Sequence, residues 1–380
     1  MQGRKGIAMK TLYVHIGTPK TGTKAIQHFC MDNNEVLGKY GFCYPDLSAI
    51  TPEVIREKNG RFLVEEFKDE DQAVCRQKER EKYREGMDVI ERLFLQYDNV
   101  ILSDEGIYRW TYKRRKKLWA ELKEDGDRCG FTPKVILYLR RQDEFLSSLW
   151  KQNIKMSVPP ACDWTWERYI ANIPARRQIN YYEKIKSIAD VLGKENVIVR
   201  RYDRERFYGG SIYHDFMNAV GLTLSDEYTI VQGERNKSFD GNTHEFMRIA
   251  NGVSQFNDAD RAFIRKILYA NCENSKEFRY SMFSKKENKQ FLNKLKSSNR
   301  LVAAEYLGEP DRDLFDLTIA DLPKWTPDNS YMMEDLIRFT AIGMSFLKQE
   351  NRKFQEKCDH MQRQIDEMKA LLKEKENKEE

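Results

Sequence analysis

The sequence lacks long apolar runs and paired metal ligands. It has no stretch of about 18 consecutive apolar residues, so we expect no membrane-spanning helix. The first ten residues, MQGRKGIAMK, lack the apolar core of a secretory signal and are expected to form a disordered lead. The seven cysteines are an odd, scattered set without a C-x-x-C pair, and none of the five histidines is paired at metal-ligand spacing. These absences predict reduced thiols, a cytoplasmic location and no metal site.

Composition and charge indicate a folded protein that suits anionic ligands. The 380 residues suffice for one large or two ordinary domains. Hydrophobic residues make up 40% of the chain and charged residues 33%, which is typical of a globular protein. The formal net charge of +5 is mildly basic, so it fits an anionic ligand without requiring nucleic acid as a partner.

The most informative stretch is residues 11–29, TLYVHIGTPKTGTKAIQHF. Its first six residues predict a short strand, and the apolar spacing from Thr23 onward predicts a helix with one buried side. Between them lies a loop, residues 17–22, with a glycine at each end. Loop amides and the positive end of a helix dipole together bind phosphate. Lys20 can reach an anionic oxygen from this loop, and Thr21 and Thr23 offer hydroxyl donors.

The two glycines match the spacing of the nucleoside triphosphatase loop G-x-x-x-x-G-K-[ST], but the Lys-Ser/Thr step is missing. The lysine lies inside the loop instead, which argues against ATP hydrolysis. The sequence PKTGT after a strand resembles the 5′-phosphosulfate-binding loop of sulfotransferases that use 3′-phosphoadenosine 5′-phosphosulfate (PAPS). The resemblance implies that the donor is bound by Thr18, Pro19, Lys20, Thr21, Gly22, Thr23 and Lys24.

A second stretch, residues 133–153, reads PKVILYLRRQDEFLSSLWKQN and predicts a buried strand followed by a helix. It resembles the 3′-phosphate-binding motif of the same family, in which a serine follows an arginine by eight residues, as Ser148 follows Arg140 here. A dianionic phosphate needs a guanidinium fork and a hydroxyl donor. Arg141 remains an alternative to Arg140, and Ser147 is an alternative to Ser148.

A third corner follows the predicted strand 99–102, where the chain reads Ser103-Asp104-Glu105. In an open parallel sheet, ligands bind at the carboxyl ends of the strands, so this corner should lie near the two phosphate motifs. It resembles the S-[SD]-E corner of bacterial sulfotransferases, which implies a general base for the acceptor hydroxyl. Glu105 is the first candidate, Asp104 the second, and His15 a rival within the first strand. Glu105 could instead only cap the following helix.

Weaker signals surround these motifs. Residues 50–97 are polar and charge-dense, and we interpret them as solvated helix surface. The segment 234–252 resembles a downstream part of the family, and it implies that Arg235, Lys237 and Ser238 reach PAPS from a lid, although Ser238 could be only a helix cap.

The last part of the chain carries a heptad pattern. Apolar residues are spaced alternately three and four apart, which predicts a coiled coil with a and d positions. The seam consists of Met344, Leu347, Asn351, Phe354, Cys358, Met361, Ile365, Met368 and Leu372. Asn351 at an a position favours a parallel two-stranded homodimer. The alternative is a single amphipathic helix packed on its own domain.

The combined interpretation is a bacterial, carbohydrate-type PAPS-dependent sulfotransferase, with Lys20 and Glu105 in catalysis and a saccharide hydroxyl as acceptor. The expected fold is α/β and P-loop-like, with a mostly parallel sheet of about five strands between two helix layers. The sulfotransferase domain is expected at 11–325, and a helical segment at 326–380 with its coiled coil from about 344. Two other functions stay open: a P-loop kinase or other nucleotide-dependent phosphotransferase, and a non-catalytic anion-binding scaffold.

Overall fold

The computed structural model describes residues 10–379 apart from residues 53, 70, 72, 111–116, 173–177, 231–238, 240 and 275–277. The chain divides into two compact units. The first comprises Met1–Leu149, Ile170–Glu234 and Lys285–Ala320, and the second Trp150–Tyr169, Arg235–Ser284 and Asp321–Glu380. The domain limits expected at 325 and 326 stay a prediction.

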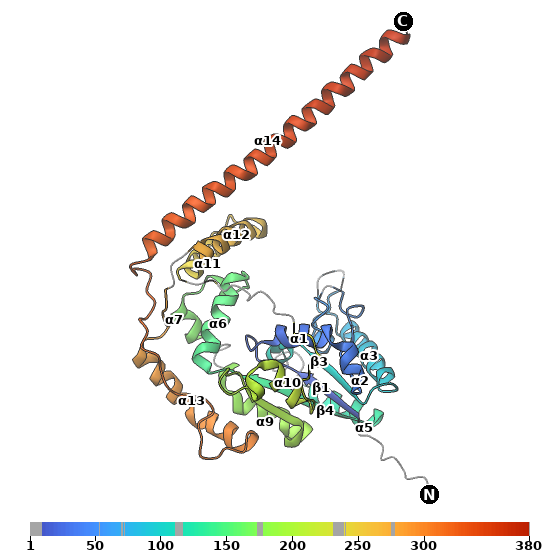
Figure 1. Cartoon of the computed structure of the whole chain (residues 1–380), viewed down its shortest axis with the longest axis vertical. Coiled ribbons are helices and arrows are strands. Elements are labelled where there is room, and N and C mark those ends of the chain that lie inside the picture. The colour runs from blue at the N-terminus through green and yellow to red at the C-terminus, as the bar shows by residue number, and fades with distance from the viewer. Residues whose placement is uncertain are drawn as a thin grey trace. The chain divides into compact units, whose positions relative to one another are not determined.

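The first unit is built around a five-stranded sheet (Figure 1). Its strands are β1 (Lys10–His15), β2 (Phe42–Cys43), β3 (Asn99–Ser103), β4 (Phe131–Leu139) and β5 (Val197–Arg201). Their order is β2-β3-β1-β4-β5, and every neighbouring pair is parallel. The predicted parallel sheet is confirmed. Since β1 lies between β3 and β4, the loop that follows β1 is flanked by the ends of both neighbours.

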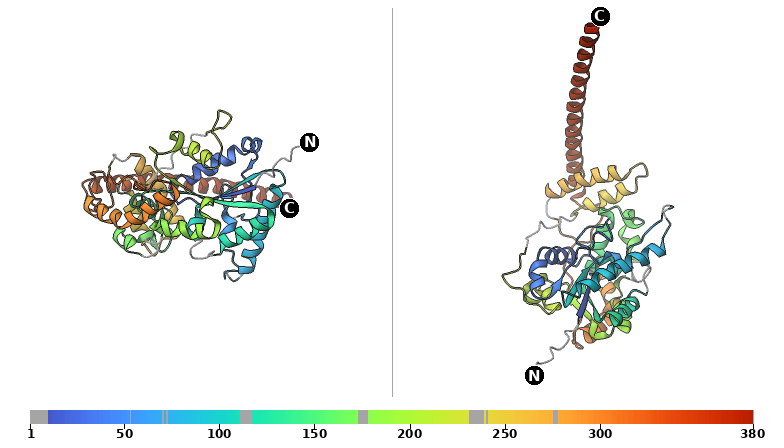
Figure 2. Two further views of the ribbon diagram at one scale, coloured as in Figure 1. Left: turned by 90° about the horizontal axis from the view of Figure 1, so that it is seen from below. Right: turned by 90° about the vertical axis from the view of Figure 1, so that its right-hand side faces the viewer.

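Helices cover both faces of this sheet (Figure 2), which gives the expected three layers. One face carries α1 (Thr23–Asp32), α2 (Asn34–Lys39) and α10 (Ile212–Ala219), and the other carries α3 (Arg76–Leu93), α5 (Leu118–Cys129), α9 (Tyr181–Leu192) and α13 (Lys285–Tyr306). Successive strand residues face opposite layers, as Tyr13 does relative to Leu12 and Val14. Both faces are apolar because both are buried, as parallel sheets require.

Shorter elements lie at the ends of the strands. The sheet unit also holds α4 (Glu105–Trp110), which starts directly after β3, and the 3₁₀ turns η1 (Arg61–Leu63), η3 (Lys194–Asn196) and η4 (Tyr208–Gly210). Helix α6 (Gln142–Lys155) follows β4, as the second motif predicted.

The segment 50–97, predicted to be solvated helix surface, is α-helical only in α3, and its described residues before α3 contain only the short 3₁₀ turn η1. The prediction was therefore wrong for most of the described residues 50–75. Asn59 explains the difference. Its side-chain amide donates to the carbonyl oxygens of Pro45 and Ile101, and its Oδ1 accepts from the amide of Ser103 at 2.8 Å. These bonds hold an irregular segment against the end of β3. Charge and polarity alone do not distinguish such a segment from a helix.

The described part of the second unit is mainly helical. It includes η2 (Ala161–Asp163), most of α7 (Trp166–Ala171), α11 (Thr243–Asn251), α12 (Asp258–Asn274) and the long α14 (Met332–Glu379). The rings of Trp150, Trp166, His244 and Trp325 pack together in it, the closest pair being His244 and Trp325 with centroids 4.8 Å apart. The helical C-terminal segment is therefore present, whereas its coiled-coil pairing stays a prediction.

Two general expectations can be compared with the structure. Every helix within the described ranges is too short or too polar to pass through a bilayer. All seven cysteines are free thiols.

Candidate active site

The loop after β1 has the backbone of an anion cradle. Gly17 and Gly22 have φ angles of +82° and +73°, and Lys20 shares this left-handed region at +68°. Gly22 is the N-cap of α1 and supplies no side-chain cap, so the first amides of the helix remain available to an anion. A Cβ added to Gly22 would lie 2.4 Å from Cδ1 of Ile212, so the end of that side chain would have to shift, and the positive φ angle itself favours glycine here.

Two threonines fix the loop from within. The amide and the hydroxyl of Thr18 both donate to the carbonyl of Tyr138 on β4, at 2.9 and 3.1 Å. The hydroxyl of Thr21 donates to the carbonyl of Thr18 at 2.5 Å, so it is already engaged inside the loop. The buried hydroxyl of Thr23 has no partner among the described residues. Among these three loop threonines, Thr23 is thus the one whose hydroxyl is unpaired within the described residues.

The remaining loop residues differ in exposure. Pro19 is buried, whereas the side chains of Lys20 and Lys24 are exposed. Lys20 lies at the tip of the loop, and its carbonyl is 3.5 Å from Nη1 of Arg140. This contact brings the two predicted phosphate motifs together, although they are 120 residues apart in the chain.

The two arginines after β4 have different surroundings. Nε of Arg140 donates a hydrogen bond to Oε2 of Glu144 at 3.0 Å. Its guanidinium lies over the ring of Tyr202, 5.8 Å from the ring centroid. Arg141 instead donates to both carboxylate oxygens of Asp143, and its Nη1 donates to the backbone carbonyls of Asp316 and Thr318. The guanidinium of Arg141 therefore anchors a neighbouring segment, and Arg140 is the one beside the loop.

Both candidate serines lie half-buried on α6. Ser148 follows Glu144, the partner of Arg140, by one helical turn, so the two share a face. Ser147 follows Glu144 by three residues and lies on the same side of the helix, so it stays an alternative. This placement is compatible with a phosphate held between Arg140 and Ser148.

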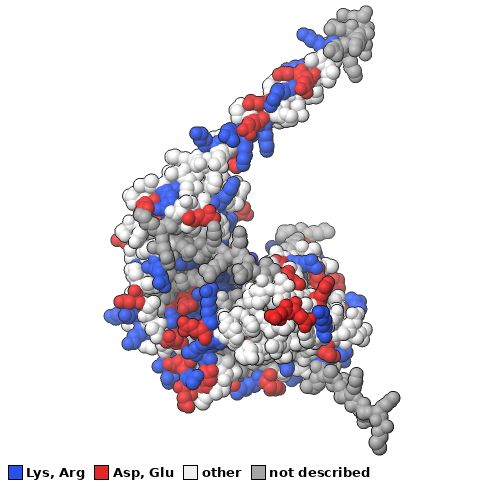
Figure 3. Space-filling view, viewed as in Figure 1, with Lys and Arg blue, Asp and Glu red and all other residues white. Residues whose placement is uncertain are grey.

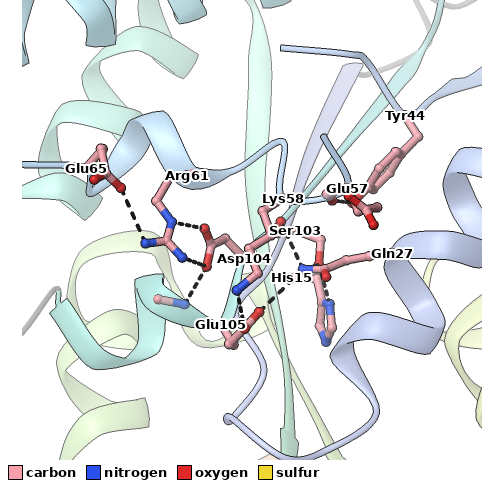
Figure 4. A network of polar contacts seen from close by, with 11 residues as sticks. His15, Gln27, Tyr44, Glu57, Lys58, Arg61, Glu65, Ser103, Asp104 and Glu105 are labelled. Atoms are coloured by element: carbon pink, nitrogen blue, oxygen red, sulfur yellow. Dashed lines mark hydrogen bonds and ion pairs between the residues drawn. The ribbon is translucent and has the colours of Figure 1, made fainter. Parts of the chain in front are cut away.

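Glu105 lies at the end of β3 in a network of polar side chains (Figure 4). Its Oε1 is 2.5 Å from Nζ of Lys58, and its Oε2 is 3.5 Å from Nε2 of Gln27. Burial raises the pKa of Glu105, but the charge of Lys58, its hydrogen bond and the charge of Arg61 together hold that pKa below its ordinary value. Glu105 is thus ionised at neutral pH and keeps 22% of its side chain exposed.

Asp104 has a different position. It is fully buried, pairs with the guanidinium of Arg61, and accepts the amide of Gly106 at 2.6 Å. Burial raises the pKa of Asp104 although Arg61 opposes the change. Asp104 thus holds the start of α4 and the irregular segment that carries Arg61. Its neighbour Glu105 lies next to the loop after β1.

His15 is the last residue of β1 and is completely buried. Its Nδ1 is 2.9 Å from Oγ of Ser103, and burial lowers the pKa of His15 to about 4, with Glu105 opposing the shift. The imidazole is therefore neutral at neutral pH. Its Nε2 has no partner within the described part of the chain.

Three buried polar atoms are left without a partner around this corner, as far as the chain is described: His15 Nε2, Thr23 Oγ1 and Gln27 Oε1. The loop adjoins them, since a Cβ on Gly17 would lie 3.1 Å from Cβ of Glu105 and 3.4 Å from the Thr23 hydroxyl. Folded proteins seldom leave buried polar atoms unpaired, because each costs about 1–3 kcal/mol.

Sequence reasoning missed Lys58, Arg61 and Gln27. A signal existed for Gln27, which interrupts the apolar side of α1 four residues after Thr23. No pattern marked Lys58 or Arg61, because they lie on the irregular segment beside β3. The residues Arg235, Lys237 and Ser238 lie outside the described residues.

No group of three His, Cys, Asp or Glu side chains within the described ranges is arranged to hold a metal ion. The expectation that the reaction uses no metal stays a prediction.

Comparisons with known proteins give distant likenesses. No family model matches the chain. A protein of Archaeoglobus fulgidus, described as uncharacterized, is 28% identical over 177 residues, which is 46% of this chain and 46% of that protein. The chain therefore covers less than half the length of this relative.

Three solved structures with likeness to this chain are sulfotransferases. The sulfotransferase of Alicyclobacillus acidocaldarius is 13% identical with a TM-score of 0.36, over 66% of this chain and 98% of that one. The sulfotransferase domain from the curacin biosynthetic pathway is 10% identical with a TM-score of 0.34, over 59% and 78%. The sulfotransferase domain from the Synechococcus PCC 7002 olefin synthase is 11% identical with a TM-score of 0.31, over 71% and 98%.

Proposed function

We propose that the protein is a PAPS-dependent sulfotransferase that transfers the sulfuryl group to a hydroxyl of a saccharide. The observation that carries this proposal is the contact between Arg140 and the carbonyl of Lys20, which joins the two phosphate motifs at one edge of the sheet. A donor with a phosphate at each end of its ribose needs two separate anion sites at a short distance. A nucleoside triphosphate needs one continuous site.

The strand order supports an orientation for the donor. The loop follows β1, with the Arg140 corner after β4 on one side and the Glu105 corner after β3 on the other. A donor with its 5′-phosphate on the loop and its 3′-phosphate at Arg140 and Ser148 extends its sulfuryl group away from β4. That direction leads toward Glu105.

The proposed reaction is an in-line transfer. The acceptor oxygen forms a bond to sulfur while the bond from sulfur to the bridging phosphate oxygen breaks. Glu105 takes the proton from the acceptor hydroxyl, for which its lowered pKa keeps it ionised. Lys20 and the amides of Thr21 to Thr23 stabilise the charge that develops on the departing phosphate. The products are a sulfate ester and 3′,5′-bisphosphoadenosine.

Other parts of the proposal rest on the resemblance alone. These are the saccharide as acceptor class and the contacts from Arg235, Lys237 and Ser238. We also propose a cytoplasmic location, which the seven free thiols support.

Binding and turnover assays test the proposal together. Bisphosphoadenosine should raise the melting temperature, and ATP with magnesium should not. Full-length protein supplied with PAPS and a saccharide library should release bisphosphoadenosine in step with sulfated product. Glu105→Gln should retain bisphosphoadenosine binding and lose most turnover, because a base contacts the acceptor and not the donor.

The competing functions predict other results. Stabilisation by ATP with magnesium, followed by phosphate transfer, would identify a kinase. Binding of bisphosphoadenosine without turnover on any acceptor of the library would favour an anion-binding scaffold.

A further inference from the structure

The C-terminal helix α14 packs on its own unit only over its first part. Phe339 packs on Phe246 with ring centroids 5.5 Å apart, and the ammonium of Lys266 lies over the ring of Phe346 at 5.1 Å. Beyond Phe346 the described side chains of α14 are exposed, apart from the half-buried Cys358. The rest of the helix therefore has no layer of its own unit over it in the part of the chain that is described.

An apolar stripe runs along this uncovered part. The larger apolar seam residues are 41–68% exposed. They are Met344, Leu347, Phe354, Met361, Ile365, Met368 and Leu372. The stripe follows the a and d positions of a heptad repeat on one continuous helix, and from residue 344 to 372 it is about 43 Å long at 1.5 Å per residue. Soluble proteins seldom leave such a stripe in water.

We infer that a second copy of this chain covers the stripe, in a parallel and in-register two-stranded coiled coil. The alternating spacing of three and four residues is the pattern that two supercoiled helices bury between them. From Leu347 to Lys373 the residues outside the seam are polar apart from Ala370 and Leu371, and several are paired within the helix, for example Arg352 with Glu356 at 3.4 Å and Gln362 with Asp366 at 3.0 Å. Figure 3 shows basic and acidic side chains interleaved along it.

Charge at the flanking positions selects the parallel orientation. A parallel pair places each g residue near the e residue five positions later in the partner. This gives Glu350 with Gln355, Lys357 with Gln362, and Gln364 with Lys369. None of these pairs joins like charges, so the parallel arrangement meets no repulsion.

An antiparallel pair is disfavoured by the same residues. It would place e positions against e positions and g positions against g positions. Two antiparallel registers overlap the whole seam. In one of them Lys348 of one helix lies opposite Lys369 of the other, and in the second Lys357 lies opposite Lys357 of the other copy. Like charges opposed across a helix pair are destabilising.

Two seam residues give the arrangement a distinct signature. In a parallel, in-register pair, Asn351 and Cys358 each lie opposite their own copies, because both occupy a positions. Paired asparagine amides fix register and strand number. Paired cysteines come within the Cα separation of about 7 Å that a disulfide requires.

The test uses the full-length protein at micromolar concentration. Light scattering should give twice the chain mass of 45.1 kDa. Brief treatment with diamide, which takes up the two protons and two electrons of the thiol pair, should yield a covalent dimer. Cys358→Ser should abolish the covalent dimer and keep the doubled mass.

Two further cysteine variants on the Cys358→Ser background test whether the pair is parallel and in register. Met361→Cys, at a d position, should restore the cross-link, whereas Arg363→Cys, at an outward f position, should not. A single-chain mass would overturn the inference, as would a doubled mass that survives deletion of residues 348–380. A dimer that cross-links through neither Cys358 nor Met361→Cys would overturn the parallel register. None of these readouts depends on sulfotransferase activity.

Discussion

The ammonium of Lys58 lies 2.5 Å from Oε1 of Glu105, and both side chains are largely buried. Lys58 reaches this position from the irregular segment that Asn59 fastens to the end of β3. The pair does two things for Glu105. It holds the carboxylate ionised in surroundings that would otherwise raise its pKa, and it fixes one oxygen so that the other points toward Gln27.

Replacing Lys58 should therefore shift the pH dependence of turnover. In Lys58→Met, burial is no longer opposed by the ammonium, so the pKa of Glu105 rises. The acidic limb of the profile of kcat/KM against pH should move to higher pH. Bisphosphoadenosine affinity should change little, because Lys58 contacts Glu105, the proposed base for the acceptor.

Lys39→Met is a matched control for this experiment, because Lys39 forms an exposed ion pair with Glu227 on the surface. It should leave the profile in place. An acidic limb that stays fixed in Lys58→Met would mean that Glu105 is not the group whose ionisation limits turnover.

Lys20 should be tested with asparagine and not with alanine. The residue has a φ angle of +68°. Asparagine tolerates this left-handed conformation, whereas alanine adopts it only with strain. Lys20→Asn should keep the melting temperature within about 2 °C and lower kcat by at least about 100-fold, since it removes a charge that acts on the departing phosphate. Lys39→Asn, at an exposed lysine outside the loop, is the control and should retain most activity. Comparable losses in both variants would contradict a specific role for Lys20.

The two arginines after β4 should separate binding from stability. Arg140→Ala should weaken bisphosphoadenosine by at least about tenfold and leave adenosine 5′-phosphate nearly unchanged, because a charge-assisted bond to the 3′-phosphate is worth about 1.5–3 kcal/mol. Arg141→Ala should instead lower the melting temperature, because it releases Asp143 and the carbonyls of Asp316 and Thr318. Titration calorimetry and thermal unfolding measure the two effects. The opposite pattern would assign the 3′-phosphate to Arg141.

The buried histidine His15 should make the fold sensitive to acid. Its pKa is about 4 in the folded protein and about 6.5 when exposed, so between these values the unfolded chain binds more protons. The free energy of unfolding therefore falls as pH is lowered from 6.5 to 4, by about 3 kcal/mol at most for this residue. His244, whose pKa burial also lowers, adds to the loss in the same direction.

Denaturant titrations of the parent protein and His15→Asn at pH 7 and pH 4.5 measure this contribution. Asparagine can keep a bond to Ser103, and the variant should lose less stability over the interval than the parent. Equal losses in both proteins would show that His15 takes up no proton on unfolding.

Local sequence patterns determined the elements that carry the motifs. The strand before Gly17, the start of α1 at Thr23, and the strand and helix around Arg140 all lie where apolar periodicity and glycine placed them. These features depend on neighbours within a few residues, which is the range over which periodicity and backbone preference act. The parallel sheet followed from the alternation of such strands with helices.

Contacts between distant segments decided which side chains surround Glu105 and which of the two arginines lies beside the loop. Lys58 and Arg61 join the corner at Glu105 across more than 40 residues, through a segment whose composition was mistaken for helix surface. The choice between Arg140 and Arg141 depends on carbonyls of Asp316 and Thr318, more than 170 residues further along the chain. A side chain's partners are set by which strands become neighbours in the sheet, and a single sequence shows the strands but not the contacts that their packing creates.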